Sequence, residues 1–182
     1  MDIFLLVSNI VLWVVVLFNI VLTLTIIRQM NRQGKLTTSG FHSVIDVPIG
    51  QPAPAFEAPL LSGETVSLQN YMGRKVVFLF SGPYCKACRE ILPGIASWIK
   101  ESERAGRTIV LVSDGPAEET SKFLNDTGLQ IPTIIAPKGV NSFMDDYQVL
   151  GTPSFCSINE KGLIHAAGYP SLETGELKYA FN

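Results

Sequence analysis

The sequence predicts an α/β domain with a mixed central sheet flanked by helices, preceded by one N-terminal transmembrane helix. The apolar run at 76–80 is typical of a central strand covered on both faces. Stretches with helical spacing separate it from two further apolar runs, 108–112 and 133–136, which indicates strands joined by helices. A closing hairpin at 154–167 makes the last strands antiparallel. The first apolar stretch, 3–27, is long enough to cross a bilayer as a helix.

We interpret the stretch 3–27 as an uncleaved membrane anchor that contacts the lipid bilayer. A cleaved signal peptide is the alternative, and it fits less well. No basic region precedes the run, the run is too long, and no small-residue cleavage site follows it. We therefore expect an anchor at 1–28, a flexible polar tether at 29–50 and the folded domain at 51–182.

The first half of the domain predicts a hairpin, the central strand and a long helix. The turn at 62–64 precedes an alternating segment, 65–68, which suits a short edge hairpin. After the strand at 76–80, apolar residues recur with helical spacing over 91–99. We expect this helix to end near Gly106.

The second half predicts alternating strands and helices. A buried strand at 108–112 is followed by a helix that begins near Pro116, with acidic residues in its first turn, and stops at Gly128. A short strand at 133–136 and a helix at 140–147 lead to the closing hairpin.

The motif with chemical potential is Cys85-Lys86-Ala87-Cys88, at the turn from the buried strand into the long helix. Two thiols at this spacing can close a disulfide within one helical turn, and the helix dipole favours the thiolate of the first. A Cys85 thiolate attacks a substrate disulfide, and Cys88 then resolves the mixed disulfide. The sequence therefore predicts thiol–disulfide exchange with Cys85 and Cys88 as the catalytic residues.

Two basic residues, Lys86 and Arg89, stand close to the first thiol. Positive charge there should lower the pKa of Cys85 and make the couple more oxidising. The alternative, that both are ordinary solvated residues at an exposed helix end, stays open.

A second motif, Gly151-Thr152-Pro153-Ser154, precedes the closing hairpin. We expect a cis peptide bond at Pro153, because the motif stands at a strand entrance in a chain that also carries the two paired cysteines. The backbone of Thr152 would then face an extended substrate peptide beside Cys85. Tyr84, Thr152 and Pro153 are the expected substrate-binding residues.

Metal binding, further catalytic residues and nucleic-acid binding are only weakly indicated by the sequence. A zinc site normally needs four ligands in two spaced pairs, and Cys156, His42 and His165 form no second pair, so we expect no metal and no cofactor. Cys156 and His165 are interpreted as structural residues. Asp114, at a strand end, could relay protons, but a solvated turn acid is favoured. The formal net charge of −2 gives no indication of nucleic-acid binding.

These motifs together resemble the membrane-anchored, thioredoxin-like redoxins of the TlpA type, and within them the MauD family of methylamine utilisation proteins. The resemblance rests on the segments 53–56 and 63–68, on the run from Ser81 through both cysteines to Pro93, and on the Gly-Thr-Pro at 151–153. It covers nearly the whole chain and implies a thioredoxin-like sandwich.

The resemblance also implies a role in maturing the disulfide-rich small subunit of methylamine dehydrogenase, with a MauE-like membrane protein as redox partner. Two departures limit it. Lys86-Ala87 replaces the Pro-containing dipeptide usual in the family, so its redox poise is not carried over. No acid occurs in 75–81, where thioredoxins keep a buried carboxylate, so the proton acceptor is not identified.

Two features give opposing indications of the side of the membrane on which the domain lies. Arg28, Arg32 and Lys35 follow the anchor, and the positive-inside rule would place the domain in the cytoplasm. Disulfide processing requires oxidising surroundings. We expect the extracytoplasmic (periplasmic) side, because a bias of three charges can be overridden.

Two other functions remain alternatives. A peroxiredoxin-like peroxidase fits the Pro54-x-Phe56 opening, but such a site needs a Thr three residues before its cysteine, where this chain has Gly82. A binding protein on the same fold is the other alternative, either a redox-inactive assembly factor or a metallochaperone whose two thiolates could hold Cu(I), with His165 as a candidate third ligand.

Overall fold

The computed structural model describes residues 7–9, 12–23 and 44–170 of the 182-residue chain. The chain divides into two units, Met1–Phe41 and His42–Asn182. Each unit is described separately below.

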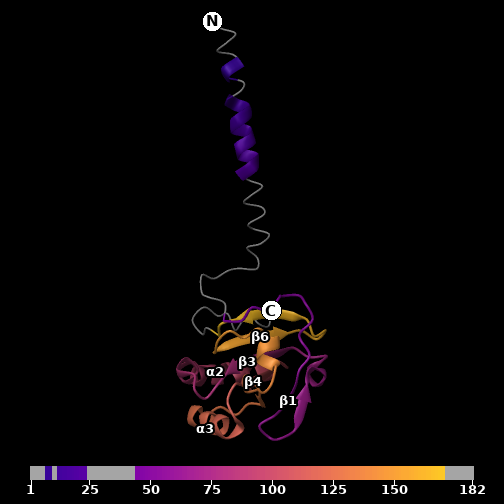
Figure 1. Cartoon of the computed structure of the whole chain (residues 1–182), viewed down its shortest axis with the longest axis vertical. Coiled ribbons are helices and arrows are strands. Elements are labelled where there is room, and N and C mark those ends of the chain that lie inside the picture. Colours follow the sequence, from indigo (N-terminus) through magenta and orange to yellow (C-terminus); the bar gives the residue numbers. More distant parts are fainter. Residues whose placement is uncertain (1–6, 10–11, 24–43, 171–182) are drawn as a thin grey trace. The chain divides into compact units, whose positions relative to one another are not determined.

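The described part of the first unit is helical, at 7–9 and 12–23 (Figure 1, indigo). Within the described residues, no helix combines the length and the apolar character needed to span a membrane. The predicted anchor, 3–27, extends beyond the described residues at both ends, so the anchor stays a prediction.

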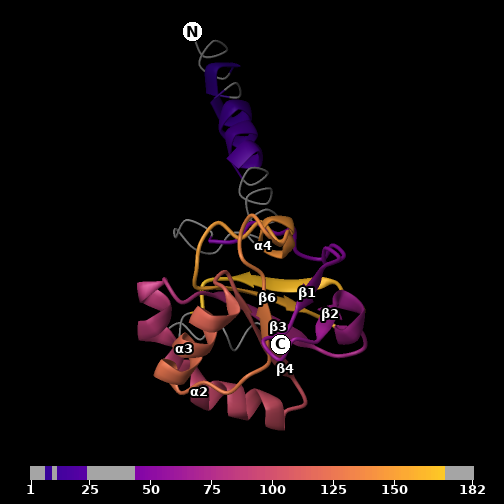
Figure 2. The same cartoon turned by 60° about the horizontal axis from the view of Figure 1, so that its bottom comes forward.

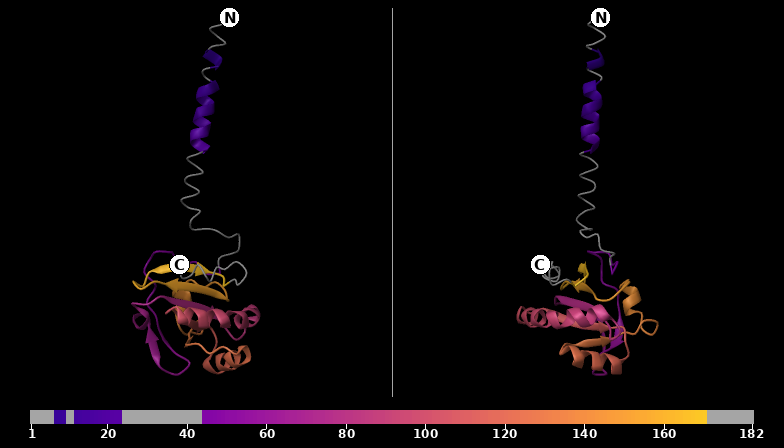
Figure 3. Two further views of the ribbon diagram at one scale, coloured as in Figure 1. Left: turned by 180° about the vertical axis from the view of Figure 1, so that it is seen from behind. Right: turned by 90° about the vertical axis from the view of Figure 1, so that its left-hand side faces the viewer.

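A five-stranded mixed sheet with the order β5-β4-β3-β6-β7 forms the centre of the second unit. The central strand β3 (Val76–Ser81) is parallel to β4 (Thr108–Ser113) and antiparallel to β6 (Ser154–Ile158). The edges are β5 (Thr133–Ile135), parallel to β4, and β7 (Ile164–Gly168), antiparallel to β6 (Figure 3). This is the mixed α/β sheet that the sequence predicted, with the closing hairpin as β6 and β7.

Helices cover both faces of this sheet (Figure 2). The side chains of α2 (Lys86–Arg104) and α3 (Ala117–Thr127) pack with Val77 and Leu79 on one face. The short helix α4 (Phe143–Asp146) packs on the other. Because β3 is buried at all six positions, both of its faces need apolar side chains, which explains the apolar run at 76–80 before Ser81.

The predicted hairpin forms as β1 (Glu57–Pro59) and β2 (Thr65–Ser67), followed by the 3-10 turn η1 (Leu68–Tyr71). The two strands make a separate antiparallel sheet, and Leu60 bridges to Ile134 of β5. The hairpin therefore lies against an edge strand of the main sheet.

The packed domain begins earlier than the sequence predicted. Ile45 and Val47 are buried at 4% and 8% exposure, and Ile45 forms a β-bridge with Val149. Alternate apolar side chains of an extended segment enter the core here, so residues 44–50 belong to the domain, and the expected boundary at 51 is corrected.

An aromatic cluster fills the core on the α4 side of the sheet. Phe56 and Phe143 stack with ring centroids 3.9 Å apart, and both make edge contacts with Phe78 of β3. Tyr147 is fully buried among them, and its hydroxyl donates a hydrogen bond to the Pro54 carbonyl oxygen at 3.0 Å. Burial of this phenol raises the pKa of Tyr147.

Removing this hydroxyl should weaken the attachment of the segment around Pro54. We expect Tyr147→Phe to lower the free energy of unfolding by about 1 kcal/mol, because one half-buried hydrogen bond is lost while the ring still packs. Urea unfolding of the full chain measures the change, with the partly exposed Tyr169→Phe as the control. Equal stability of both variants would contradict the assigned bond.

Candidate active site

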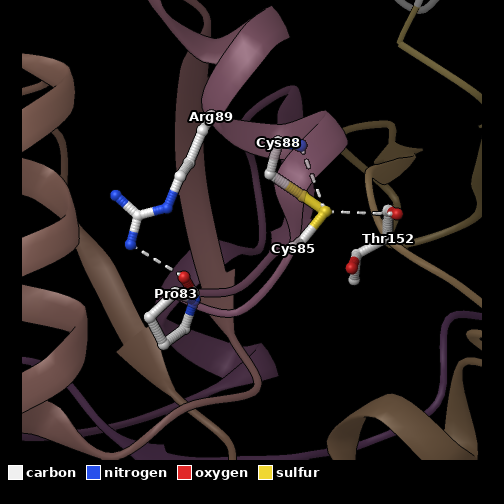
Figure 4. Close-up of a disulfide and its surroundings, with 5 residues drawn as sticks. All are labelled: Pro83, Cys85, Cys88, Arg89 and Thr152. Atoms are coloured by element: carbon white, nitrogen blue, oxygen red, sulfur yellow. Dashed lines mark hydrogen bonds between the residues drawn. A yellow bond between two sulfur atoms is a disulfide. The ribbon is translucent and has the colours of Figure 1, made fainter.

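The disulfide between Cys85 and Cys88 lies at the N-terminus of α2 (Figure 4). Cys85 is the N-cap residue and Cys88 lies in the first turn, with their Cα atoms 5.2 Å apart. Cys88 is fully buried, whereas Cys85 is partly exposed. An attacking thiolate from outside therefore has access to Cys85 and not to Cys88.

The sulfur of Cys85 occupies the place of an N-cap acceptor. The backbone N–H of Cys88 donates to Cys85 Sγ at 3.1 Å, and the N–H of Cys85 donates to the Gly82 carbonyl oxygen at 3.2 Å. When the disulfide is reduced, the same N–H and the positive end of a 19-residue helix stabilise a thiolate at Cys85.

The Thr152-Pro153 motif faces this sulfur from the other side. The peptide bond is cis, as predicted, and the Thr152 carbonyl oxygen lies 3.4 Å from Cys85 Sγ (Figure 4). The two segments meet because β6 begins at Ser154, directly beside Phe80 near the end of β3. The sheet pairing thus brings together residues 67 positions apart in the chain.

Each of the two motifs of the site has an exposed side chain with a large apolar surface close to it in sequence. Tyr84, predicted as a substrate-binding residue, precedes Cys85 and is 74% exposed. Leu150, two residues before Thr152, is 71% exposed and was missed by the sequence analysis. An apolar residue immediately before the Gly-Thr-Pro motif was the available signal.

Both predicted tuning residues, Lys86 and Arg89, are exposed, but the charge of Arg89 is engaged in contacts away from the disulfide. The guanidinium of Arg89 points away from the sulfur atoms (Figure 4). It donates to the Pro83 carbonyl oxygen at 2.9 Å, pairs with Asp126 at 3.2 Å and lies over the ring of Phe123. Because its charge is paired with Asp126, Arg89 is better described as a residue that connects α2 to α3 and to the turn before Cys85 than as one that tunes the pKa of Cys85.

Asp114 is not the solvated turn acid that the sequence favoured. Its Oδ1 is inaccessible to solvent and has no hydrogen-bond partner among the described residues. Burial raises the pKa of this carboxyl, although its own backbone N–H and Lys138 act in the opposite direction. A Cβ atom at Gly82 would collide with Oδ1, so the threonine that a peroxiredoxin-like site requires would fit at this position only if the Asp114 carboxyl moved.

The remaining candidates lie away from the disulfide. Cys156 is buried in β6 opposite Phe78, and burial raises the pKa of its thiol to about 12, which confirms the prediction of a core residue. His165 lies beside Lys75, at the end of β3 remote from Cys85. In the part of the chain that the structure describes, no three His, Cys, Asp or Glu side chains are placed to hold a metal ion, and His42 lies outside that part.

The raised pKa of the Asp114 carboxyl predicts how the stability of the folded protein changes with pH. Its raised pKa means that the folded protein holds this proton more tightly than the unfolded chain, whose Asp pKa is about 3.9. The charge therefore opposes folding above the folded pKa, and this penalty disappears as the pH falls below the unfolded value.

We expect Asp114→Asn to raise the melting temperature at pH 7 and to lose that advantage near pH 3, in thermal scans of the full chain. The exposed Asp46→Asn is the control for a change of net charge. A lower melting temperature for Asp114→Asn at pH 7 would indicate a stabilising partner for the carboxylate.

Comparison with known proteins identifies the family to which the chain belongs. The AhpC/TSA family model matches residues 49–167. The thioredoxin-like protein YneN of Bacillus subtilis is 35% identical over 124 residues, which cover 66% of this chain and 71% of that protein. The methylamine utilisation protein MauD of Paracoccus versutus is 30% identical over 168 residues, which cover 91% of this chain and 82% of that protein.

Solved structures agree in fold. A thiol:disulfide interchange protein from Bacteroides sp. matches 74% of this chain and 88% of its own, with 26% identity and a TM-score of 0.63. The thioredoxin domain of a thiol-disulfide oxidoreductase from Bacteroides vulgatus matches 75% of this chain and 99% of its own, with a TM-score of 0.66. The chain therefore belongs to the AhpC/TSA family, is a homologue of the MauD proteins, and is a thiol–disulfide oxidoreductase with a thioredoxin-like fold.

Proposed function

We propose that this thiol–disulfide oxidoreductase is tethered to a membrane by residues 3–27 and exchanges disulfides with client proteins during the maturation of an exported enzyme. The observation that carries the exchange role is the Cys85–Cys88 disulfide, with its accessible sulfur at a helix N-terminus and opposite the Thr152 backbone. Accessible Cys85 is the nucleophile and buried Cys88 is the resolving thiol.

The exchange proceeds in two steps. The thiolate of reduced Cys85 attacks a client disulfide, forms a mixed disulfide and releases one client thiolate. The Cys88 thiolate then attacks Cys85 Sγ, restores the Cys85–Cys88 disulfide and releases the second client thiolate, so that two electrons pass to the client. The reverse sequence begins with a client thiolate attacking Cys85 of the oxidised protein, and it oxidises the client.

Client recognition uses the backbone beside Cys85. An extended peptide can pair with main-chain groups of Thr152 while Pro153 holds this loop against the disulfide. Exposed Tyr84 and Leu150 offer apolar contacts to side chains that flank the client cysteine. The exposed charge of Lys86 favours the reduced, thiolate form of Cys85.

The client and the partner are proposed by analogy with the MauD relatives. Similarity over most of the chain supports maturation of an enzyme subunit, with the methylamine dehydrogenase small subunit as the first candidate, and a MauE-like membrane protein as the redox partner. Such a client requires the domain to lie on the extracytoplasmic side, where protein disulfides persist.

Removing the resolving thiol should trap clients. We expect Cys88→Ser in the full chain to accumulate mixed disulfides through Cys85, because the second step cannot occur. Cys85→Ser should trap none. Non-reducing gels of cell extracts, followed by reduction, detect these adducts.

The control variant is Cys156→Ser, which leaves both reacting sulfurs in place and changes a buried thiol. It should trap no more client than the wild-type protein and retain exchange. The absence of adducts with Cys88→Ser, or equal trapping by Cys85→Ser, would contradict the assigned roles of the two cysteines.

The proposed topology is tested by fusions after Asn182. We expect alkaline phosphatase, which is active only after export, to be active in the fusion, and a reporter that functions only in the cytoplasm to be inactive. The opposite pattern would follow from Arg28, Arg32 and Lys35. It would replace the maturation role by a cytoplasmic reductase or redox sensor.

A further inference from the structure

The segment through which the chain enters the domain is hydrogen-bonded to the loop that faces the disulfide. We call residues 44–46 the entry segment and residues 148–153 the substrate loop. The backbone N–H groups of Leu150 and Gly151 both donate to the Val44 carbonyl oxygen, at 2.9 and 3.1 Å. The N–H of Asp46 donates to the Gln148 carbonyl oxygen at 3.2 Å.

The substrate loop is thus held from two sides. Helix α4 holds its beginning, because the N–H groups of Gln148 and Val149 donate to the carbonyl oxygens of Asp145 and Met144, each at 2.9 Å. From Val149 to Gly151 the partner is the entry segment. Thr152, the next residue, places its carbonyl oxygen 3.4 Å from Cys85 Sγ.

Apolar packing keeps the entry segment in place. Ile45 is 4% exposed and belongs to the same core cluster as Met144, Tyr147 and Val149. The Val44 side chain also lies close to the loop, since a Cβ atom at Gly151 would meet it at 3.6 Å. The entry segment is therefore an integral neighbour of the loop. If it separated, the N–H groups of Leu150 and Gly151 would both lose their acceptor.

We infer that the entry segment is a positioning element of the active site: its backbone holds the substrate loop so that Thr152 faces Cys85 and an extended client peptide can bind. The inference rests on the proposed exchange function. It predicts that a change at residue 46, remote in sequence from both cysteines, alters client binding more than it alters the chemistry of the disulfide.

The test compares Asp46→Pro with Asp46→Ala in the purified full chain. Proline removes the N–H that donates to Gln148, whereas alanine keeps it, and both remove the same exposed carboxylate. Reduced protein is assayed with a ten-residue peptide that contains one internal disulfide, and with oxidised glutathione, which is too short to pair along the loop.

We expect Asp46→Pro to raise KM for the peptide about fivefold, the effect of losing one backbone hydrogen bond, with kcat and the glutathione rate unchanged. Asp46→Ala should match the wild-type protein in every parameter. Equal KM values for the two variants, or a parallel loss with both substrates, would overturn the positioning role.

Amide hydrogen exchange gives a second measurement that does not depend on turnover. The amides of Leu150 and Gly151 should exchange faster in Asp46→Pro than in Asp46→Ala, while those of β3 stay equally protected. Unchanged exchange at Leu150 and Gly151 would also overturn the inference. If the wild-type protein exchanged disulfides with neither substrate, the proposed function would fail, and the hydrogen-exchange comparison would still decide the positioning role.

Discussion

The burial of β3 on both faces is the constraint on which the rest of the structure depends. All six of its side chains are buried, so helices must cover both faces, and neighbouring strands must pair with both edges. The strand ends at Ser81, and four residues later the chain turns into α2 with Cys85 as its N-cap. A rigid strand and a long helix thus hold the disulfide from either side.

The same end of the sheet gathers the other parts of the site. Parallel β4 ends there next to Asp114, and antiparallel β6 begins there after Pro153. The hydroxyls of Ser81 and Ser154 and one oxygen of Asp114 are buried at this end without a hydrogen-bond partner among the described residues. Polar groups of this kind are costly in a core and are tolerated where function requires them. Their position beneath the reactive turn agrees with that rule.

Much of the domain could be predicted from the sequence because its signals are local. The apolar run at 76–80, the left-handed Gly128 that ends α3 and the five-residue connection between β6 and β7 each depend on neighbouring residues only. The start of the domain could not be predicted in this way. The segment that contains Ile45 is short and is interrupted by Asp46 and Pro48, so it carries no periodic signal, and only its burial and its pairing with Val149 show that it belongs to the core.

For the site, the sequence by itself was enough to identify the cysteine pair, the helix that begins at it and the Thr-Pro motif, because each of them is recognised from the order and spacing of neighbouring residues. Only the tertiary structure decided what each neighbour does. Arg89 is held by Asp126, 37 positions away, and Asp114 is half-buried against Gly82. The loop beside Cys85 is bound to Val44, more than a hundred residues earlier. Such contacts follow from how strands pair and helices pack, and no local pattern in the chain records them.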